Sequence, residues 1–517
     1  MRESGILLPI FSLPSRYGIG CFSRDAYDFL DFLERSGTGY WQILPMGPTG
    51  FGNSPYQPVS AFAGNPYFIS PETLIEDGML TYEEADSFSF GSNPDRVDYG
   101  ALYENREKLL ALASARFYEK LDTDPELSES FSDFKHRESF WLTDYADFVA
   151  IKKHNGGASW QEWDEDLKKR DALALSRIKS EQDVKECINL IYFEQYEFDR
   201  QWRALREYAA KKNIKIIGDL PFYVSLDSSD VWSHPEVFLM DANLKPTVVA
   251  GCPPDAFSAT GQLWGNPIYD WKALSTVHYK WWTDRMQRNY ELFDVIRIDH
   301  FHGFCDYYAI PFEDETAEHG KSEKGPGIAL FKELKDQLGE LRIIAEDLGN
   351  QTPENVALLE ESGFPGMKVL QYGFTSWDSC YVNHRHTANS VVYTGTHDNT
   401  PTRAWVEEIS EGERSFTRRY INSLNTDYNG LVWDIIREAY RSVADLCIIP
   451  IQDYLCLGRE ARINTPGSGE GNWQWRLWKG AFSNELASSI RGMTEVYSRI
   501  PKTPEVPEET QEVIETS

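Results

Sequence analysis

The stretch "VIRIDHFHGF", residues 295–304, places an arginine, an aspartate and two histidines at the end of an apolar run. Successive side chains of a strand point to opposite faces, so Arg297 and Asp299 share one face and the isoleucines beside them share the other. A buried ion pair rarely adds stability, because desolvation of both charges offsets most of their attraction. The pattern therefore indicates a functional site at the end of a strand.

Chemically active side chains also end three other apolar runs. They are Asp219 after "IKIIG", Glu346 and Asp347 after "LRIIA", and His397 and Asp398 after "VVYTGT". Retaining glycoside chemistry needs an ionised carboxylate as nucleophile and a protonated carboxyl for the leaving oxygen, roughly 5 to 5.5 Å apart. Arg297 favours the charged form of Asp299, which suits the nucleophile. The sequence therefore predicts a sugar-cleaving site, provided that these strand ends converge.

Eight short apolar runs supply the strands that must position these residues. They are "GILLPI", "WQILPMGP", "IKIIGDLPFYV", "DVIRIDH", "LRIIAEDLG", "MKVLQYGF", "VVYTGTHDN" and "LCIIPIQDYL". Helical patterns separate most of them, for example Ser23 to Ser36, with Gly37 placed to end the helix. The count predicts an α/β fold, a (β/α)8 TIM barrel, whose active site lies at the carboxyl ends of the strands.

One connection is far longer than a barrel needs. Charged helical patterns fill residues 71–183, between the second and third runs, and we expect a mainly helical subdomain inserted there. The catalytic barrel is then expected over residues 1–500, with long loops around its site. Residues 501–517 are acidic and rich in proline, which predicts a disordered tail.

Composition limits the partners of the chain. The chain has 81 acidic and 51 basic residues, a net charge of −30, which argues against binding to nucleic acid or to anionic membranes. Seven scattered cysteines indicate neither a disulfide framework nor a zinc site, so we expect a cytoplasmic protein. No apolar run reaches membrane-spanning length. No phosphate-binding or calcium-binding loop is present in the sequence, so no cofactor or metal is expected. The oligomeric state is not indicated.

Longer motifs resemble one known family over nearly the whole chain. They include "SPYQPVSAFAGNPY", "GDLPFYVSLDSSDVW", "PPDAFSATGQLWGNPIYDW", "RIDHFHGF", "AEDLG", "GFPGMKVLQYGF", "YTGTHDN" and "EARINTPGSGEGNWQWR". Together they resemble the 4-alpha-glucanotransferases (amylomaltases, or disproportionating enzymes) of glycoside hydrolase family 77. The resemblance implies transfer of α-1,4-glucan segments between maltooligosaccharides, starch-type glucans and glucose, through a covalent glycosyl-aspartate.

The same resemblance implies a role for individual residues. Asp299 is expected as the nucleophile, Glu346 as the general acid/base and Asp398 as the stabiliser of the transition state. Sugar contacts are expected from Tyr56, Asp219, Arg297, His397 and Asn472, and acceptor-side contacts from Asp255, Phe257, Gln262, Trp264 and Asn266. The three carboxylates coincide with those chosen from the strand ends.

The chain departs from the family pattern at a few positions. His302 stands where an arginine usually follows "DHF", Tyr372 takes the aromatic place in "LQYGF", and Phe51 replaces a common tyrosine. None of these positions is one of the three carboxylates. They bear on the rate, on the pH profile and on a second glucan site that the family can use near Phe51.

Some of these residues also allow purely structural interpretations. Asp398 could cap a helix that begins near Thr400, whereas Glu346 is not needed as a cap because Thr352 and Pro353 already start the next helix. Trp264 could be a core aromatic residue. Its place in a segment rich in glycine and proline favours exposure as a sugar platform.

Three other functions remain open at this stage. A metal-dependent hydrolase could use His300 and His302 as paired ligands, but the other strand ends offer only His397. A non-catalytic glucan-binding protein would not need all three carboxylates. A hydrolase could use the same three carboxylates. The segment Val248–Pro267 favours a transferase over a hydrolase, because the composition of this segment predicts a covering loop that excludes water.

Overall fold

The computed structural model describes residues 2–50, 52–254, 258–349 and 351–501. Phe51, Asp255, Phe257 and the predicted tail beyond residue 501 therefore lie outside the described residues. No described helix is both long enough and apolar enough to cross a lipid bilayer.

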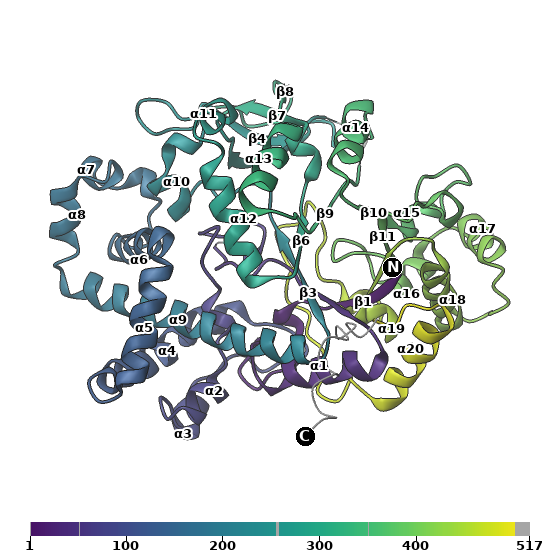
Figure 1. Cartoon of the computed structure of the whole chain (residues 1–517), viewed down its shortest axis with the longest axis horizontal. Coiled ribbons are helices and arrows are strands. Elements are labelled where there is room, and N and C mark those ends of the chain that lie inside the picture. Colours follow the sequence, from purple (N-terminus) through teal and green to yellow (C-terminus); the bar gives the residue numbers. More distant parts are fainter. Residues whose placement is uncertain (1, 51, 255–257, 350, 502–517) are drawn as a thin grey trace, which may run out of the picture.

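Eight parallel strands close into a barrel in the right half of Figure 1. They are β1 (Glu3–Leu7), β2 (Tyr40–Gln42), β3 (Lys215–Leu220), β6 (Val295–Ile298), β9 (Ile343–Ala345), β10 (Gly366–Val369), β11 (Ser390–Tyr393) and β12 (Leu446–Pro450). Their order around the barrel is β1-β12-β11-β10-β9-β6-β3-β2. Each strand comes from one of the eight apolar runs, and the predicted (β/α)8 barrel is confirmed.

The barrel interior is apolar below the level of the charged residues. A cluster of buried side chains, among them Ile217 and Ile344, joins strands from around the barrel, and Val295 packs against it. Asp219 and Arg297 follow Ile217 and Val295 by two residues, on the same strand faces. The charges therefore lie just beyond the apolar layer, toward the carboxyl ends of the strands.

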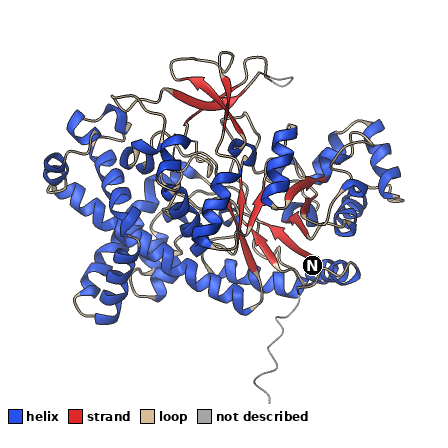
Figure 2. Ribbon diagram, turned by 45° about the horizontal axis from the view of Figure 1, so that its top comes forward, coloured by secondary structure: helices blue, strands red, loops and turns tan. Residues whose placement is uncertain are grey.

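Helices cover the outside of the barrel in Figure 2. They include α1 (Arg24–Ser36), α12 (Lys280–Leu292), α13 (Ile328–Leu338), α14 (Pro353–Ser362), α16 (Thr402–Glu408), α18 (Tyr428–Arg441) and α20 (Asn484–Val496). The remaining helices that follow β3 are α10 (Ser229–Ser233), which packs against α6 (Ser139–His154), and α11 (Trp271–Thr276), α15 (Leu370–Gly373), α17 (Glu411–Ile421) and α19 (Ile451–Tyr454). Helix α1 ends as predicted, since Gly37 adopts the left-handed conformation, with φ of 69°. The Thr352 side chain accepts from the Asn355 N–H at the start of α14, which confirms that cap.

A group of helices connects β2 to β3 on the left of Figure 1. They are α2 (Pro71–Glu76), α3 (Tyr82–Asp86), α4 (Tyr99–Leu121), α5 (Pro125–Arg137), α6 (Ser139–His154), α7 (Glu165–Lys168), α8 (Ala172–Ile178) and α9 (Gln182–Lys211). Helix α9 continues well past residue 183 and leads directly into β3. The division into a barrel and an inserted subdomain over residues 71–183 stays a proposal.

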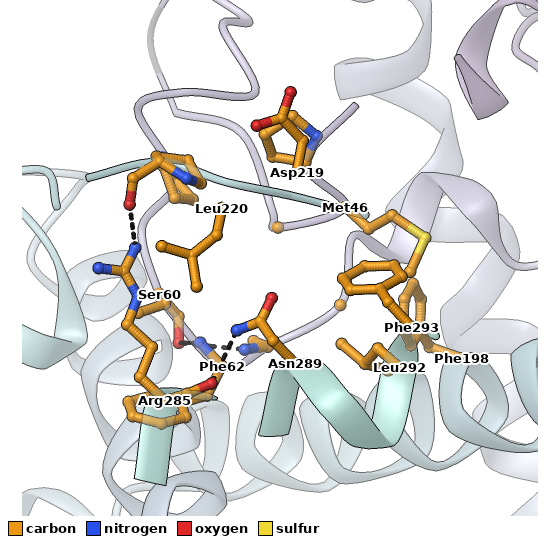
Figure 3. A pocket seen from close by; sticks show the side chains of 17 residues that line it. Met46, Ser60, Phe62, Phe198, Asp219, Leu220, Arg285, Asn289, Leu292 and Phe293 are labelled. Atoms are coloured by element: carbon orange, nitrogen blue, oxygen red, sulfur yellow. Dashed lines mark hydrogen bonds between the residues drawn. The ribbon is translucent and has the colours of Figure 1, made fainter. Parts of the chain in front are cut away.

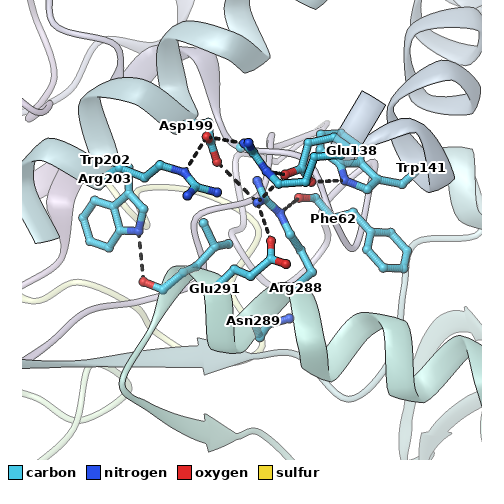
Figure 4. Close-up of polar contacts among 12 residues, drawn as sticks. Phe62, Glu138, Trp141, Asp199, Trp202, Arg203, Arg288, Asn289 and Glu291 are labelled. Carbon is cyan, nitrogen blue, oxygen red and sulfur yellow. Dashed lines mark hydrogen bonds and ion pairs between the residues drawn. The ribbon is translucent and has the colours of Figure 1, made fainter. Parts of the chain in front are cut away.

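A buried cluster of charges joins this group of helices to the barrel (Figure 4). Arg288 of α12 lies 3.4 Å from Asp199 of α9 and 3.5 Å from Glu138, which immediately precedes α6. Arg288 is 1% exposed, and Arg203 pairs with the same Asp199 at 2.6 Å. The cluster therefore fixes three helices against one another.

A second sheet stands apart from the barrel, at the top of Figure 2. Its antiparallel order is β5 (Gln262–Pro267), β4 (Val248–Cys252), β7 (Asp306–Pro311) and β8 (Lys321–Lys324). The segment Val248–Pro267, expected as a loop, therefore contains two paired strands. Its glycines and prolines hide the period-two alternation that identifies strands in a sequence.

Candidate active site

Arg297 links two carboxylates at the ends of β3 and β6. Its Nη1 donates to both oxygens of Asp219, at 2.7 and 2.8 Å, and its Nη2 lies 3.0 Å from Asp299 Oδ1. Asp219 and Arg297 are directly paired in the strand register, and both are buried, whereas the Asp299 side chain is 31% exposed. Asp219 is thus held by Arg297, while Asp299 remains open to a reactant.

Glu346 follows β9 and is held by backbone N–H groups. His300 N–H donates to its Oε2 at 2.8 Å, and Leu348 N–H donates to its Oε1 at 3.0 Å. Burial raises the pKa of Glu346 to about 7, and the charge of Asp299 adds to this rise, while Arg297 opposes it. Glu346 is therefore partly protonated near neutral pH, as a general acid requires.

His300 adopts an uncommon backbone conformation beside Asp299. Its φ is 51°, in the left-handed region that non-glycine residues rarely adopt. This turn directs the His300 N–H toward Glu346. Backbone strain of this kind costs about 1–3 kcal/mol and is concentrated at functional sites.

Asp398 is held by the segment that follows α19. Asn464 Nδ2 donates to Asp398 Oδ1 at 2.7 Å, and His397 Nε2 lies 3.3 Å from the same oxygen. Arg462 donates to the Asp398 carbonyl at 2.9 Å. The interpretation of Asp398 as a helix cap is wrong, because α16 begins at Thr402 and its first N–H donates to Asp453.

Tyr56 contacts both Asp219, at 2.8 Å, and His397, which lies 3.3 Å from Asp398, so the ends of β3 and β11 meet at this tyrosine. Burial raises the pKa of Tyr56, and the charges of Asp219, Asp299 and Asp398 raise it further. Burial also raises the pKa of Tyr372, with smaller contributions from Asp398 and Glu346. Tyr56 and Tyr372 therefore lie among the carboxylates at the barrel mouth.

Tyr56 is fixed by two of the predicted sugar-contact residues. Its hydroxyl donates to Asp219 Oδ2 at 2.8 Å, and its ring stacks on His397 with centroids 5.2 Å apart. Asn472, the fifth predicted contact, bonds within its own loop, since its side chain accepts from Thr465 N–H and donates to the Ser468 carbonyl. The sugar contacts stay predictions.

The predicted acceptor-side residues fall into two groups. Trp264 donates to Gln262 Oε1 at 3.1 Å and meets the His300 ring edge-to-face at 5.2 Å, which places both beside the nucleophile segment. Asn266 is buried, and its amide bonds to the Val224 carbonyl and to Gln57. The Asn266 amide is therefore bonded to other protein groups, which suits a structural role beside the site. Asp255 and Phe257 lie outside the described residues.

Sequence reasoning missed Arg462 and Asn464. They belong to the motif "EARINTPGSGEGNWQWR", yet they follow no strand directly, so the strand-end rule does not select them. Only their contacts with Asp398 identify them. In the described part of the chain, no group of three or more histidine, cysteine or acidic residues is arranged to hold a metal ion.

Comparisons with known proteins agree with the fold and with the motifs. The sequence model of the family described as 4-alpha-glucanotransferase matches residues 8–480. The 4-alpha-glucanotransferase of Clostridium butyricum is 46% identical over 493 residues, covering 95% of this chain and 99% of the relative. That of Thermus thermophilus is 44% identical over 505 residues, covering 96% and 99%.

A solved structure gives the same result. The amylomaltase from Streptococcus agalactiae, in complex with acarbose, superposes with a TM-score of 0.93 at 39% identity, covering 97% of this chain and 100% of that chain. These matches confirm the resemblance drawn from the motifs. The chain is therefore an enzyme of the 4-alpha-glucanotransferase family.

Proposed function

We propose that this enzyme transfers α-1,4-glucan segments from a maltooligosaccharide or starch-type glucan to the 4-hydroxyl of another glucan or of glucose. The reaction retains the anomeric configuration and passes through a covalent bond to Asp299. One observation carries the proposal. Arg297 stabilises the charge of Asp299 at 3.0 Å, while burial raises the pKa of the neighbouring Glu346 to about 7.

The first step forms the glycosyl-enzyme. A carboxylate oxygen of Asp299 attacks the anomeric carbon as Glu346 gives its proton to the glycosidic oxygen. The bond from that oxygen to the anomeric carbon breaks, and the shortened glucan leaves with a free 4-hydroxyl. Asp398, paired with His397 and Asn464, stabilises the positive charge that develops on the sugar ring.

The second step transfers the segment. Glu346, now a carboxylate, takes the proton from the 4-hydroxyl of the acceptor, whose oxygen attacks the anomeric carbon. The bond to Asp299 breaks, and both carboxyl groups return to their first protonation states. Water competes with the acceptor, so the site must exclude water and hold a sugar.

The acceptor is held on the side of β5. Trp264 is partly exposed beside His300, and its ring offers an apolar face to a sugar. On the donor side, Tyr56, Asp219, Arg297 and His397 surround the site of the first sugar. We also propose a reducing cytoplasm as its location, since its seven cysteines are scattered along the sequence without the close spacing of a disulfide framework or a zinc site.

A product analysis from one pure substrate tests the proposal. Maltotriose alone should give glucose together with a series of glucans longer than maltotriose. Asp299→Asn and Glu346→Gln should each lower this transfer by several orders of magnitude in a folded protein. Glucose and maltose with no longer product would replace the transferase with a hydrolase.

A further inference from the structure

A cavity of about 460 Å³ lies outside the barrel, against the helices that connect β2 to β3. Its walls come from the segment after β2, from α6 and α10, and from α11 and the start of α12. None of the residues proposed for catalysis or sugar contact lines it. Its size is within the roughly 300–1,000 Å³ of small-molecule sites.

Aromatic side chains form much of the wall. Phe62, Phe140, Trp141 and Trp281 all line the cavity. Phe62 meets Phe140 edge-to-face at 5.6 Å and Trp281 edge-to-face at 5.9 Å. Phe140 is 46% exposed, so its ring is accessible to a ligand in the cavity. Such rings suit a ligand with apolar faces.

Hydrogen-bonding groups line the same cavity. They are the carboxylates of Asp144, Asp230, Glu236 and Asp284, together with Ser229, Ser233, His234 and Lys280. Three carboxylates have a cationic partner: Asp144 pairs with Arg170, Glu236 with His234 and Asp284 with Lys280. Asp230 accepts from the Ala61 N–H at 2.9 Å.

These groups select the chemistry of the ligand. The four carboxylates outnumber the basic side chains of the lining, Lys280 and His234, which disfavours phosphates and phosphorylated sugars. A purely apolar ligand would displace water from the carboxylates without replacing its hydrogen bonds. A neutral sugar meets both needs, because its hydroxyls donate to carboxylates and its C–H faces lie against aromatic rings.

The inner wall is held rigidly by the charge cluster of Figure 4. Trp141 donates to Glu138 at 2.8 Å, and Arg288 lies over the Trp141 ring at 5.5 Å and donates to the Phe62 carbonyl at 3.4 Å. Buried charges of this kind add little stability against well-packed apolar residues. They do pre-organise two walls of the cavity, as a binding site requires.

The cavity lies close to the catalytic strands. Ser60 and Phe62 also line a smaller cavity of about 40 Å³, and Asp219 at the end of β3 lines that cavity as well (Figure 3). One chain segment, residues 60–62, therefore separates the larger cavity from the space beneath the active site.

We propose that the larger cavity binds a second segment of α-1,4-glucan, outside the catalytic mouth. The sugar class rests on the proposed function, whereas the neutral polyol chemistry rests on the cavity itself. A long glucan held at both places gains effective concentration at the active site, and a short oligosaccharide does not.

Filling the cavity tests the proposal. Ala273 of α11 lines the cavity, and its exposed neighbour Lys272 does not, so Ala273→Trp and Lys272→Trp form a matched pair. In an Asp299→Asn background, calorimetric titration with maltotetraose should find one binding site fewer per chain with Ala273→Trp than with Lys272→Trp. The same number of sites in both variants would overturn the proposal.

Turnover provides a second measurement with Asp299 intact. Ala273→Trp should raise the KM for amylose about tenfold and leave maltotriose turnover unchanged. If Ala273→Trp does not fold, the variant Phe140→Ser, at a partly exposed position of the cavity wall, is used in its place. Unchanged affinity of this variant for maltotetraose at the second site would then contradict the proposal. The proposed function is tested by a different measurement. If it were wrong, the unmodified enzyme would not transfer glucose units from maltotriose, whatever number of binding sites the titration finds.

Discussion

Two neighbouring carboxyl groups differ because their surroundings differ. Asp299 lies 3.0 Å from the Arg297 guanidinium, whereas Glu346 accepts from the neutral backbone N–H groups of His300 and Leu348. Arg297 is shared with Asp219, which keeps the guanidinium in place. One arginine therefore supports a charged nucleophile beside a carboxyl that retains its proton near pH 7.

The pKa of Glu346 predicts how activity depends on pH. The first step needs Glu346 protonated, so kcat/KM should fall about tenfold per pH unit above pH about 7. Glu346→Gln, assayed with a glycosyl fluoride that needs no acid, should lose this alkaline decrease. An alkaline decrease that persists in Glu346→Gln would assign it to another group.

Asn464 is predicted to position Asp398 rather than to bind substrate. A hydrogen bond to a charged group contributes about 1.5–3 kcal/mol, so Asn464→Ala should lower kcat by about 10- to 100-fold with little change in KM. Asn243→Ala, at an exposed asparagine, is the control and should keep normal turnover. A raised KM with normal kcat would instead make Asn464 a substrate contact.

At the scale of elements, burial decides what the sequence could predict. Barrel strands are covered on both faces, so they read as apolar runs, and all eight were found. Strand β8, "KSEK", is fully exposed, and β5 contains glycine and proline, so neither resembles a strand. The contacts of Asn464 with Asp398 and of Arg288 with Glu138 depend on tertiary packing, which no local pattern reveals.

A substitution of Trp264 tests whether β5 favours transfer over hydrolysis. Removing its ring should weaken capture of the acceptor, so Trp264→Ala should raise the hydrolysed fraction of maltotriose several-fold. The adjacent Leu263 is exposed, and its side chain points to the other face of the strand, which makes Leu263→Ala the matched control. An equal hydrolysed fraction in both variants would remove Trp264 from the acceptor site.

At the scale of the whole molecule, the helices between β2 and β3 are joined to the barrel by buried charge. Arg288 meets Asp199, Glu138 and Glu291, and these four residues come from two helices, α9 and α12, and from the turn before α6. Such a cluster adds little over apolar packing when it is complete, but it is destabilising when one partner is missing. Its completeness therefore matters to the stability of the whole chain.

Arg288→Met should accordingly destabilise the protein. It removes Arg288 from Glu138 and Asp199, which keep Arg137 and Arg203 as partners, so the cost should be about 1.5–3 kcal/mol, and thermal unfolding should show a clearly lower Tm. Arg459→Met breaks an exposed pair with Glu408 and should cost about 0–1 kcal/mol. Equal Tm values for the two variants would show that the cluster does not join the helices to the barrel.

The central claim is a covalent bond between the glucan and Asp299, and mass spectrometry of the trapped enzyme tests it most directly. Glu346→Gln should react with α-maltosyl fluoride, whose leaving group needs no acid, and then persist as glycosyl-enzyme because no base activates the acceptor. The account predicts one maltosyl unit on the peptide that contains Asp299. An unmodified protein, or a maltosyl unit on any other residue, would contradict it.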